Sequence, residues 1–142
     1  MAAAFLLGRI ILGAYYLFSA FHHFSDTATL ARHAAAHGVP APTAAIIGSG
    51  LLLAIAGVTL LLGVLPRLGV AALVLFLVPV SFFMHAFWSD TNATARMADM
   101  VNFTKNMALL GSSLMFLAIP EPWPYSLGRT VRWRRWGIRA RA

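Results

Sequence analysis

The 142-residue sequence contains no cysteine. Disulfide bonds, thiol redox chemistry and thiolate ligation of iron–sulfur clusters are therefore excluded. Charge is also scarce, because Asp, Glu, Lys and Arg make up 11% of the chain while apolar residues make up 60%. Soluble domains carry about 25% charged residues. A water-soluble fold of this size could not bury so much apolar surface, so the composition indicates an integral membrane protein.

The apolar residues fall in four long stretches, at residues 4–24, 43–65, 68–88 and 101–119. Each is close to the roughly 20 residues that an α-helix needs to cross the hydrocarbon core of a bilayer. None shows the alternation of polar and apolar residues that is typical of membrane β-strands. We therefore expect an all-α fold, with four transmembrane helices in an up-down-up-down bundle.

Positive charge is concentrated after the fourth stretch. Residues 121–142 contain six Arg and one Glu, and their Trp residues, including Trp123, suit the membrane interface. Arg67 adds charge to the short link between the second and third stretches. Because basic residues mark cytoplasmic segments, both signals place the two termini in the cytoplasm. We expect residues 121–142 to form a tail that binds anionic lipids and not nucleic acid.

Most polar residues within the predicted helices gather near the outer end of the bundle. His85 and Trp88 close the third helix, and Asn102, Lys105 and Asn106 lie at the start of the fourth. Polar residues in membrane spans often mark a functional site, and a group of His, Lys and Asn can donate hydrogen bonds to a carbonyl. We interpret them as a candidate ligand site, with a quinone as one suitable ligand. Snorkelling of the Lys and bonding between helices by the Asn residues are the alternatives.

Arg9 lies toward the cytoplasmic end of the first predicted helix. Tyr16 and His23 follow it at successive intervals of seven residues, so the three share one helix face. Two interpretations are open: Arg9 reaches out to lipid phosphate, or the whole stripe faces the bundle. Arg9 is therefore a further candidate binding residue.

His33 and His37, in the first outer link, have a spacing that can bind a metal ion on a helix. The glutamate of the zinc-protease motif does not accompany them. We expect a short helix at the membrane interface and no metal site.

Two further patterns concern helix packing. Gly50, Ala54 and Gly57 form a stripe of small residues on the second predicted helix, which suits close packing within the bundle or in a homo-oligomer. Pro79 should kink the third helix, and such a kink can open a pocket below His85.

Three segments together resemble the DoxX family of small four-helix membrane proteins. They are residues 8–23, which begin Gly-Arg-Ile-Ile-Leu-Gly, residues 84–88, which read Met-His-Ala-Phe-Trp, and residues 102–111, which contain Lys-Asn-Met-Ala-Leu-Leu-Gly. The resemblance implies a four-helix bundle in a prokaryotic cell membrane. It also implies an association with quinone-linked oxidoreduction, as in subunits of thiosulfate:quinone oxidoreductase.

Three functions are open on these observations. The first is a quinone-associated subunit of a membrane oxidoreductase, with electrons handled by partner subunits because the sequence has no flavin, dinucleotide or iron–sulfur motif. The second is a non-catalytic membrane anchor or assembly subunit of a larger complex. The third is a small transporter, for which four helices are few unless the protein is a homo-oligomer. We favour an association with oxidoreduction.

Overall fold

A computed structural model describes residues 1–127 of the chain. Its regular elements are α1 (Ala2–Ser25), α2 (Thr27–Ala36), α3 (Pro42–Leu62), α4 (Pro66–Met84), α5 (Ala93–Met115) and the 3-10 helix η1 (Phe116–Ala118). The predicted all-α fold is confirmed. The Arg-rich residues 128–142, with their expected lipid contacts, lie outside the described residues.

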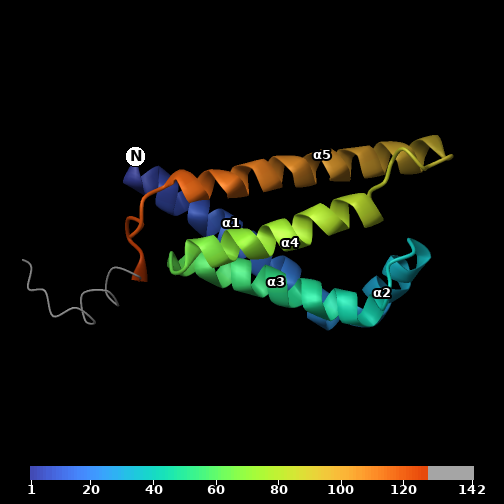
Figure 1. Cartoon of the computed structure of the whole chain (residues 1–142), viewed down its shortest axis with the longest axis horizontal. Helices are drawn as coiled ribbons and strands as arrows, with labels where there is room; N and C mark the ends of the chain where they lie inside the picture. Colours follow the sequence, from blue (N-terminus) through green and yellow to red (C-terminus); the bar gives the residue numbers. More distant parts are fainter. Residues whose placement is uncertain (128–142) are drawn as a thin grey trace, which may run out of the picture.

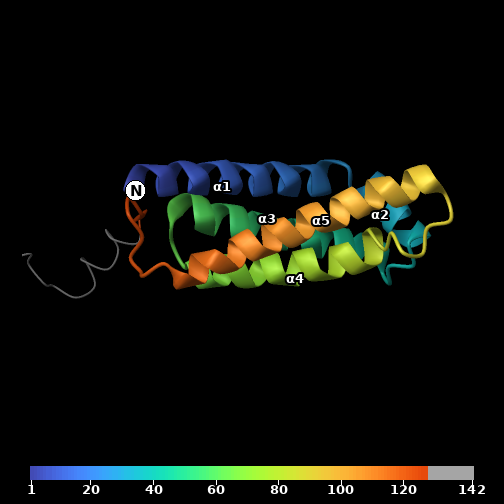
Figure 2. The same cartoon turned by 90° about the horizontal axis from the view of Figure 1, so that it is seen from above.

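The four long helices run side by side along the length of the molecule (Figure 1). α1 packs on α3, α3 on α4 and α4 on α5, while α2 folds against α3. α5 crosses α4 obliquely (Figure 2). One end of the bundle, here called the histidine end, holds α2, the C-termini of α1 and α4 and the N-terminus of α5. The opposite end holds the N-terminus, the α3–α4 turn and residues 116–127.

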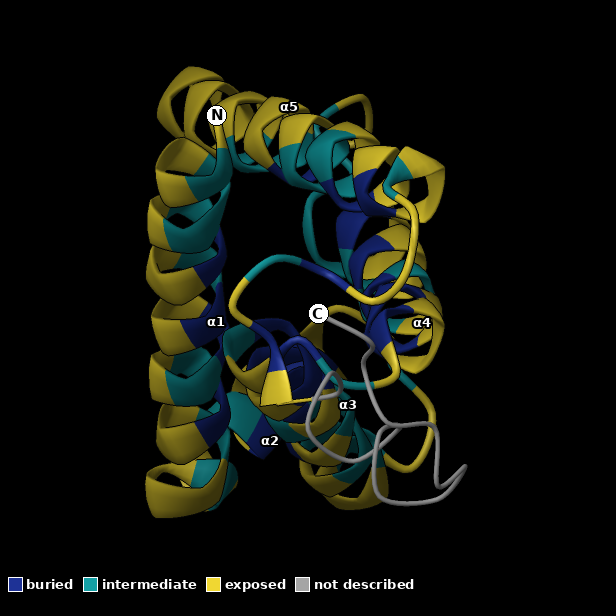
Figure 3. Cartoon of the chain, turned by 90° about the vertical axis from the view of Figure 1, so that its left-hand side faces the viewer, coloured by how far each residue is buried: buried dark blue, intermediate teal, exposed yellow. Residues whose placement is uncertain are grey.

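Three helices in the described part of the chain, α1, α3 and α4, are long and apolar enough to cross a membrane. Their outward faces expose large apolar side chains such as Ile11, Leu51 and Leu75, whereas the buried residues face inward (Figure 3). So much exposed apolar surface is unfavourable in water and favourable in lipid. The chain is therefore a multi-pass membrane protein. α5 has a similar length, but the polar residues of its N-terminal half make it less apolar than the other three.

Two helix boundaries differ from the extents of the apolar stretches. α5 begins at Ala93 rather than at residue 101, because Asn92 caps it: the Asn92 side-chain oxygen accepts hydrogen bonds from the N–H groups of Thr94 (2.9 Å) and Ala95 (3.1 Å). α4 ends at Met84 rather than at residue 88. Apolar stretches indicate where lipid can cover a helix, and the capping residues decide where the helix begins and ends.

The small-residue stripe of α3 packs against α1 within the same chain. A Cβ atom on Gly57 would lie 3.0 Å from the Gly13 carbonyl oxygen and 2.6 Å from Cγ of Leu17. A Cβ atom on Gly50 would lie 3.0 Å from the ring of Phe24. Glycine at these positions lets the two helix backbones approach closely. Of the two packing alternatives, the structure shows packing within the bundle.

Candidate functional site

The histidine end of the bundle joins His85 to Asp99. His85 follows the last residue of α4, and Asp99 lies in the second turn of α5. His85 Nδ1 and Asp99 Oδ1 are 3.0 Å apart, and their side chains are 21% and 22% exposed. A carboxylate can only accept a hydrogen bond, so Nδ1 carries the hydrogen. Nε2 of His85 is then the ring nitrogen left to take up a proton.

A cavity of about 350 Å³ lies beside this pair. Asp99 lines it together with Asp90, Ser89 and His37, and Phe83 forms part of its apolar wall. One carboxylate oxygen of Asp90 is buried and has no hydrogen-bond partner within residues 1–127. A buried polar atom without a partner is rare in folded proteins. This cavity can therefore receive a ligand that brings hydrogen-bond donors to the carboxylates.

The candidate residues on α5 separate onto two faces of the helix. Lys105 is exposed, and its Nζ donates a hydrogen bond to the Asn102 side-chain oxygen at 2.9 Å. Asn106 is buried. Consecutive residues of an α-helix point about 100° apart, so Lys105 and Asn106 cannot share one face. Neither hydrogen-bonds to His85 in the described part of the chain, and the structure does not bring the three together.

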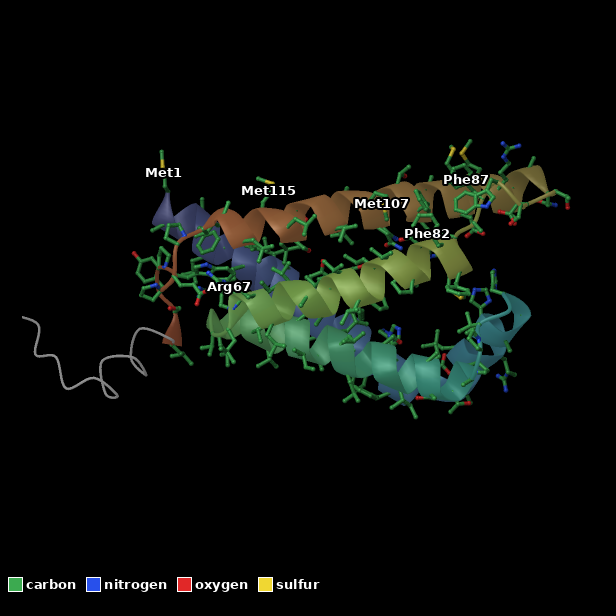
Figure 4. The ribbon with its side chains drawn as sticks, in the orientation of Figure 1. Met1, Arg67, Phe82, Phe87, Met107 and Met115 are labelled. Carbon is green, nitrogen blue, oxygen red and sulfur yellow. The ribbon has the colours of Figure 1, made fainter. Side chains whose placement is uncertain are left out.

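Trp88 packs in an aromatic cluster where α4 and α5 meet. Its ring centroid lies 5.1 Å from that of Phe87, 5.6 Å from that of Phe103 and 5.9 Å from that of Phe82. Figure 4 shows Phe82 and Phe87 at this junction, beside the N-terminal half of α5. The contacts with Phe87 and Phe103 are edge-to-face, and such contacts stabilise the fold beyond the burial of apolar surface. Trp88 therefore fixes the turn after His85 onto α5.

Arg9 faces the interior at the opposite end of the bundle. It is 1% exposed, and its guanidinium donates hydrogen bonds to the carbonyl oxygens of Pro124 (3.3 Å) and Tyr125 (3.0 Å). The rings of Phe5 and Trp123 lie about 6 Å from the guanidinium carbon. The interpretation that Arg9 reaches lipid phosphate is wrong. Here Arg9 binds the segment that follows η1.

Trp123 is fully buried beside Arg9, against Phe5 and Phe116. Trp123, which was expected to suit the membrane interface, fills the end of the bundle. Tyr125 is exposed. Residues 120–127 thus close this end of the bundle before the chain continues into the residues that are not described.

The stripe formed by Arg9, Tyr16 and His23 faces the bundle. Tyr16 is 1% exposed, and its hydroxyl faces Ser113 of α5 without a regular hydrogen bond within residues 1–127. His23, at the histidine end, lines a second cavity between α3 and α4. Pro79 also lines this cavity, so a pocket is present where the proline was expected to open one.

His33 and His37 lie at the end of α2, which packs mainly on α3. Their rings are 4.5 Å apart, and His37 Nδ1 donates to the His33 carbonyl oxygen. Among residues 1–127, no group of three or more His, Asp or Glu side chains could hold a metal ion.

The sequence did not reveal that Asp99 pairs with His85 or that His23 lines a cavity. Asp99 lies before the apolar stretch of α5, and only the Asn92 cap shows that the helix already includes it. His23 was assigned to the Arg9 stripe, but the neighbouring cavity depends on how α1, α3 and α4 pack.

The family model described as DoxX matches residues 4–86, more than half of the chain. The match covers α1, α2, α3 and α4 and includes Arg9, His23 and His85, whereas Asp99 and α5 lie beyond it. No curated protein and no solved structure matches the chain.

Proposed function

The chain belongs to the DoxX family of membrane proteins, and from this premise we propose that it is a quinone-associated subunit of a membrane oxidoreductase. The observation that supports this function is the His85–Asp99 pair beside the polar cavity. Oxidation of a quinol releases two protons and two electrons. An imidazole oriented by a carboxylate is a suitable acceptor for one of these protons.

In this proposal His85 Nε2 takes up one of the two protons that oxidation of the quinol releases. Asp99 holds the ring through Nδ1 and stabilises the imidazolium that forms. The second proton leaves through the carboxylate-lined cavity, where Asp90 also lies. The two electrons pass to a redox centre in a partner subunit, since the sequence has no flavin, dinucleotide or iron–sulfur motif. Trp88 positions the turn that carries His85. The proposed site of the quinol headgroup lies apart from Lys105, Asn102 and Arg9.

We further propose that α5 is the fourth span, in a prokaryotic cell membrane. Its 23 residues extend about 35 Å, which is long enough to cross the hydrocarbon core. Both termini then lie in the cytoplasm, and the histidine end lies outside. The Arg-rich residues 128–142 would meet anionic lipids on the cytoplasmic face.

The function can be tested on the full-length protein purified from its native membrane together with its partners. We expect the preparation to contain bound quinone and a redox-active partner subunit. Because Gln cannot take up the proton, His85→Gln should lower quinol oxidation by the complex by at least tenfold, while His33→Gln, an exposed control on α2, should not. A complex that assembles but oxidises quinol equally well without His85 would instead make this chain an anchor. Substrate flux through the purified chain alone would indicate a transporter.

A further inference from the structure

The groove between α3 and α4 near the histidine end has a volume of about 320 Å³, within the usual range for small-molecule sites. One face of each helix lines it, with Ala45, Gly48, Ser49 and Leu52 on α3 and Leu75, Phe76, Pro79 and Phe83 on α4. Open space adjoins Gly48 in the groove, since a Cβ atom built there would meet nothing within 4 Å. Most of the residues that line the groove are apolar. The few polar groups among them therefore decide which hydrogen-bonding groups a ligand must carry.

His23 presents a hydrogen-bond acceptor to the groove. Its Nδ1 lies 2.8 Å from the carbonyl oxygen of Ser19, which can only accept. Nδ1 therefore carries the hydrogen of the neutral ring, and Nε2 keeps its lone pair. Phe76 packs edge-on against the same ring, with centroids 5.9 Å apart. The tautomer and the position of the imidazole are both set by the protein before a ligand arrives.

The other polar groups of the lining are also acceptors. The Ser49 hydroxyl donates its hydrogen to the Ile46 carbonyl at 2.9 Å, so only its lone pairs are free. Pro79 has no N–H to give to the Leu75 carbonyl, which loses its normal helix partner. Both Leu75 and Pro79 line the groove. A complementary ligand must therefore be mainly apolar and must bring its own donor.

We infer that this groove binds the hydroxyl-bearing, reduced form of the quinone in preference to the oxidised form, with His23 Nε2 accepting a hydrogen bond from one ring hydroxyl. The inference rests on the proposed function and names the redox form and the location of the bound ligand. A quinone ring offers only carbonyl oxygens, which cannot donate, whereas a quinol offers two O–H donors. A site whose polar groups accept hydrogen bonds discriminates against a ligand that lacks the donor.

The surroundings of the groove suit a quinol that enters from the bilayer. Leu75 and Phe83 in its wall are 62% and 49% exposed on the lipid-facing surface, so an isoprenoid tail can extend into lipid. Phe83 also lines the polar cavity of Asp99. A quinol in the groove is thus separated by one side chain from the cavity that the carboxylates of Asp90 and Asp99 line.

The test measures the binding of a decyl-substituted benzoquinol, and of the matching benzoquinone, to the full-length protein in lipid nanodiscs without oxygen. We expect the quinol to bind roughly tenfold more tightly. Gly48→Leu fills the groove and should weaken quinol binding at least tenfold. Gly111→Leu is the matched control, because Gly111 is also a helix glycine with nothing within 4 Å of its Cβ position, but it lies outside the groove. His23→Phe keeps an aromatic ring and should abolish the preference for the quinol.

Equal affinity of the wild type for the two redox forms, or unchanged quinol affinity in Gly48→Leu, would overturn the inference. A second pair of probes, an alkylphenol and its methyl ether, separates this failure from failure of the proposed function. If neither quinol nor quinone binds but the phenol binds better than the ether, the quinone function and the quinol assignment are both wrong. If the groove variants change no affinity while His85→Gln still slows quinol oxidation, the groove inference alone is wrong.

Discussion

His85 Nδ1 and Asp99 Oδ1 lie 3.0 Å apart, although 14 positions separate the two residues in the sequence. Two local features bring them together. Asn92 starts α5 early enough to include Asp99 as a helical residue, and Trp88 packs the intervening turn onto Phe103 of α5. The pair is therefore built by a helix cap that lies outside the apolar stretches and by an aromatic contact between residues at the ends of two of these stretches.

Asp99→Asn should lower quinol oxidation in the native complex by roughly tenfold or more. Asparagine has no negative charge to stabilise the imidazolium of His85, and its amide can also donate, so the tautomer of His85 is no longer fixed. The rate is measured with a short-chain quinol in membranes that contain the native partners. Asp26→Asn serves as the control, because Asp26 is an exposed carboxylate at the same end of the bundle. Equal rates in the two variants would remove Asp99 from the proposed mechanism.

The fold was predictable from the sequence where lipid imposes the pattern. Apolar stretches identify α1, α3 and α4 because a helix surrounded by lipid must be apolar along the length of a span. The same stretches miss α2, a ten-residue helix that is too short to span a membrane and packs on α3, with Ala31 and Ala34 buried. They also miss the first turns of α5, where the Asn92 cap and not hydropathy sets the boundary.

The candidate site was less predictable, because it depends on rotation about helix axes and on packing between helices. Placing Lys105 and Asn106 near the outer end was reasonable, but a helix turns adjacent residues to different faces. Arg9 was identified as unusual, yet its partners are the carbonyls of Pro124 and Tyr125, more than a hundred positions away. Backbone acceptors of this kind leave no signal in a sequence.

Single cysteines can test the proposed four-span topology, because the chain has no cysteine that would complicate labelling. Ala35→Cys and Thr91→Cys, both exposed at the histidine end, should react in intact cells with a thiol reagent that cannot cross the membrane. Arg67→Cys and Leu127→Cys, at the opposite end, should react only after the cells are broken. Labelling of Leu127→Cys from outside, together with Thr91→Cys, would show that α5 does not span.

Gly57→Leu should destabilise the isolated protein, because its side chain would have to displace Leu17 and push α1 away from α3. Overpacking of this kind costs about 1–3 kcal/mol. The midpoint of thermal unfolding in detergent reports the loss, with Gly111→Leu as the control that has open space around the new side chain. An unchanged midpoint, accompanied by loss of partner subunits during purification, would instead assign Gly57 to a docking surface.

Gly63→Ala should destabilise the bundle more than Gly38→Ala. Both glycines have positive φ, +67° for Gly63 and +74° for Gly38, so each alanine introduces backbone strain of about 1–2 kcal/mol. A Cβ atom at Gly38 would meet nothing within 4 Å, whereas one at Gly63 would collide with the Arg9 guanidinium and lie 2.6 Å from the Cβ of Ser126. The excess loss of unfolding free energy in Gly63→Ala therefore measures the combined collisions with Arg9 and Ser126.

The same comparison in an Arg9→Met background identifies the source of that excess. Removing the guanidinium should itself destabilise the protein by about 1–3 kcal/mol, since the Pro124 and Tyr125 carbonyls lose their donor. Methionine also relieves the collision at Gly63, so the excess cost of Gly63→Ala should shrink in the double variant. Additive losses would mean that the collision with Ser126, and not with Arg9, dominates. Protease sensitivity of residues 120–127 should rise in every variant that displaces Arg9, because these residues are bound to the bundle through its guanidinium.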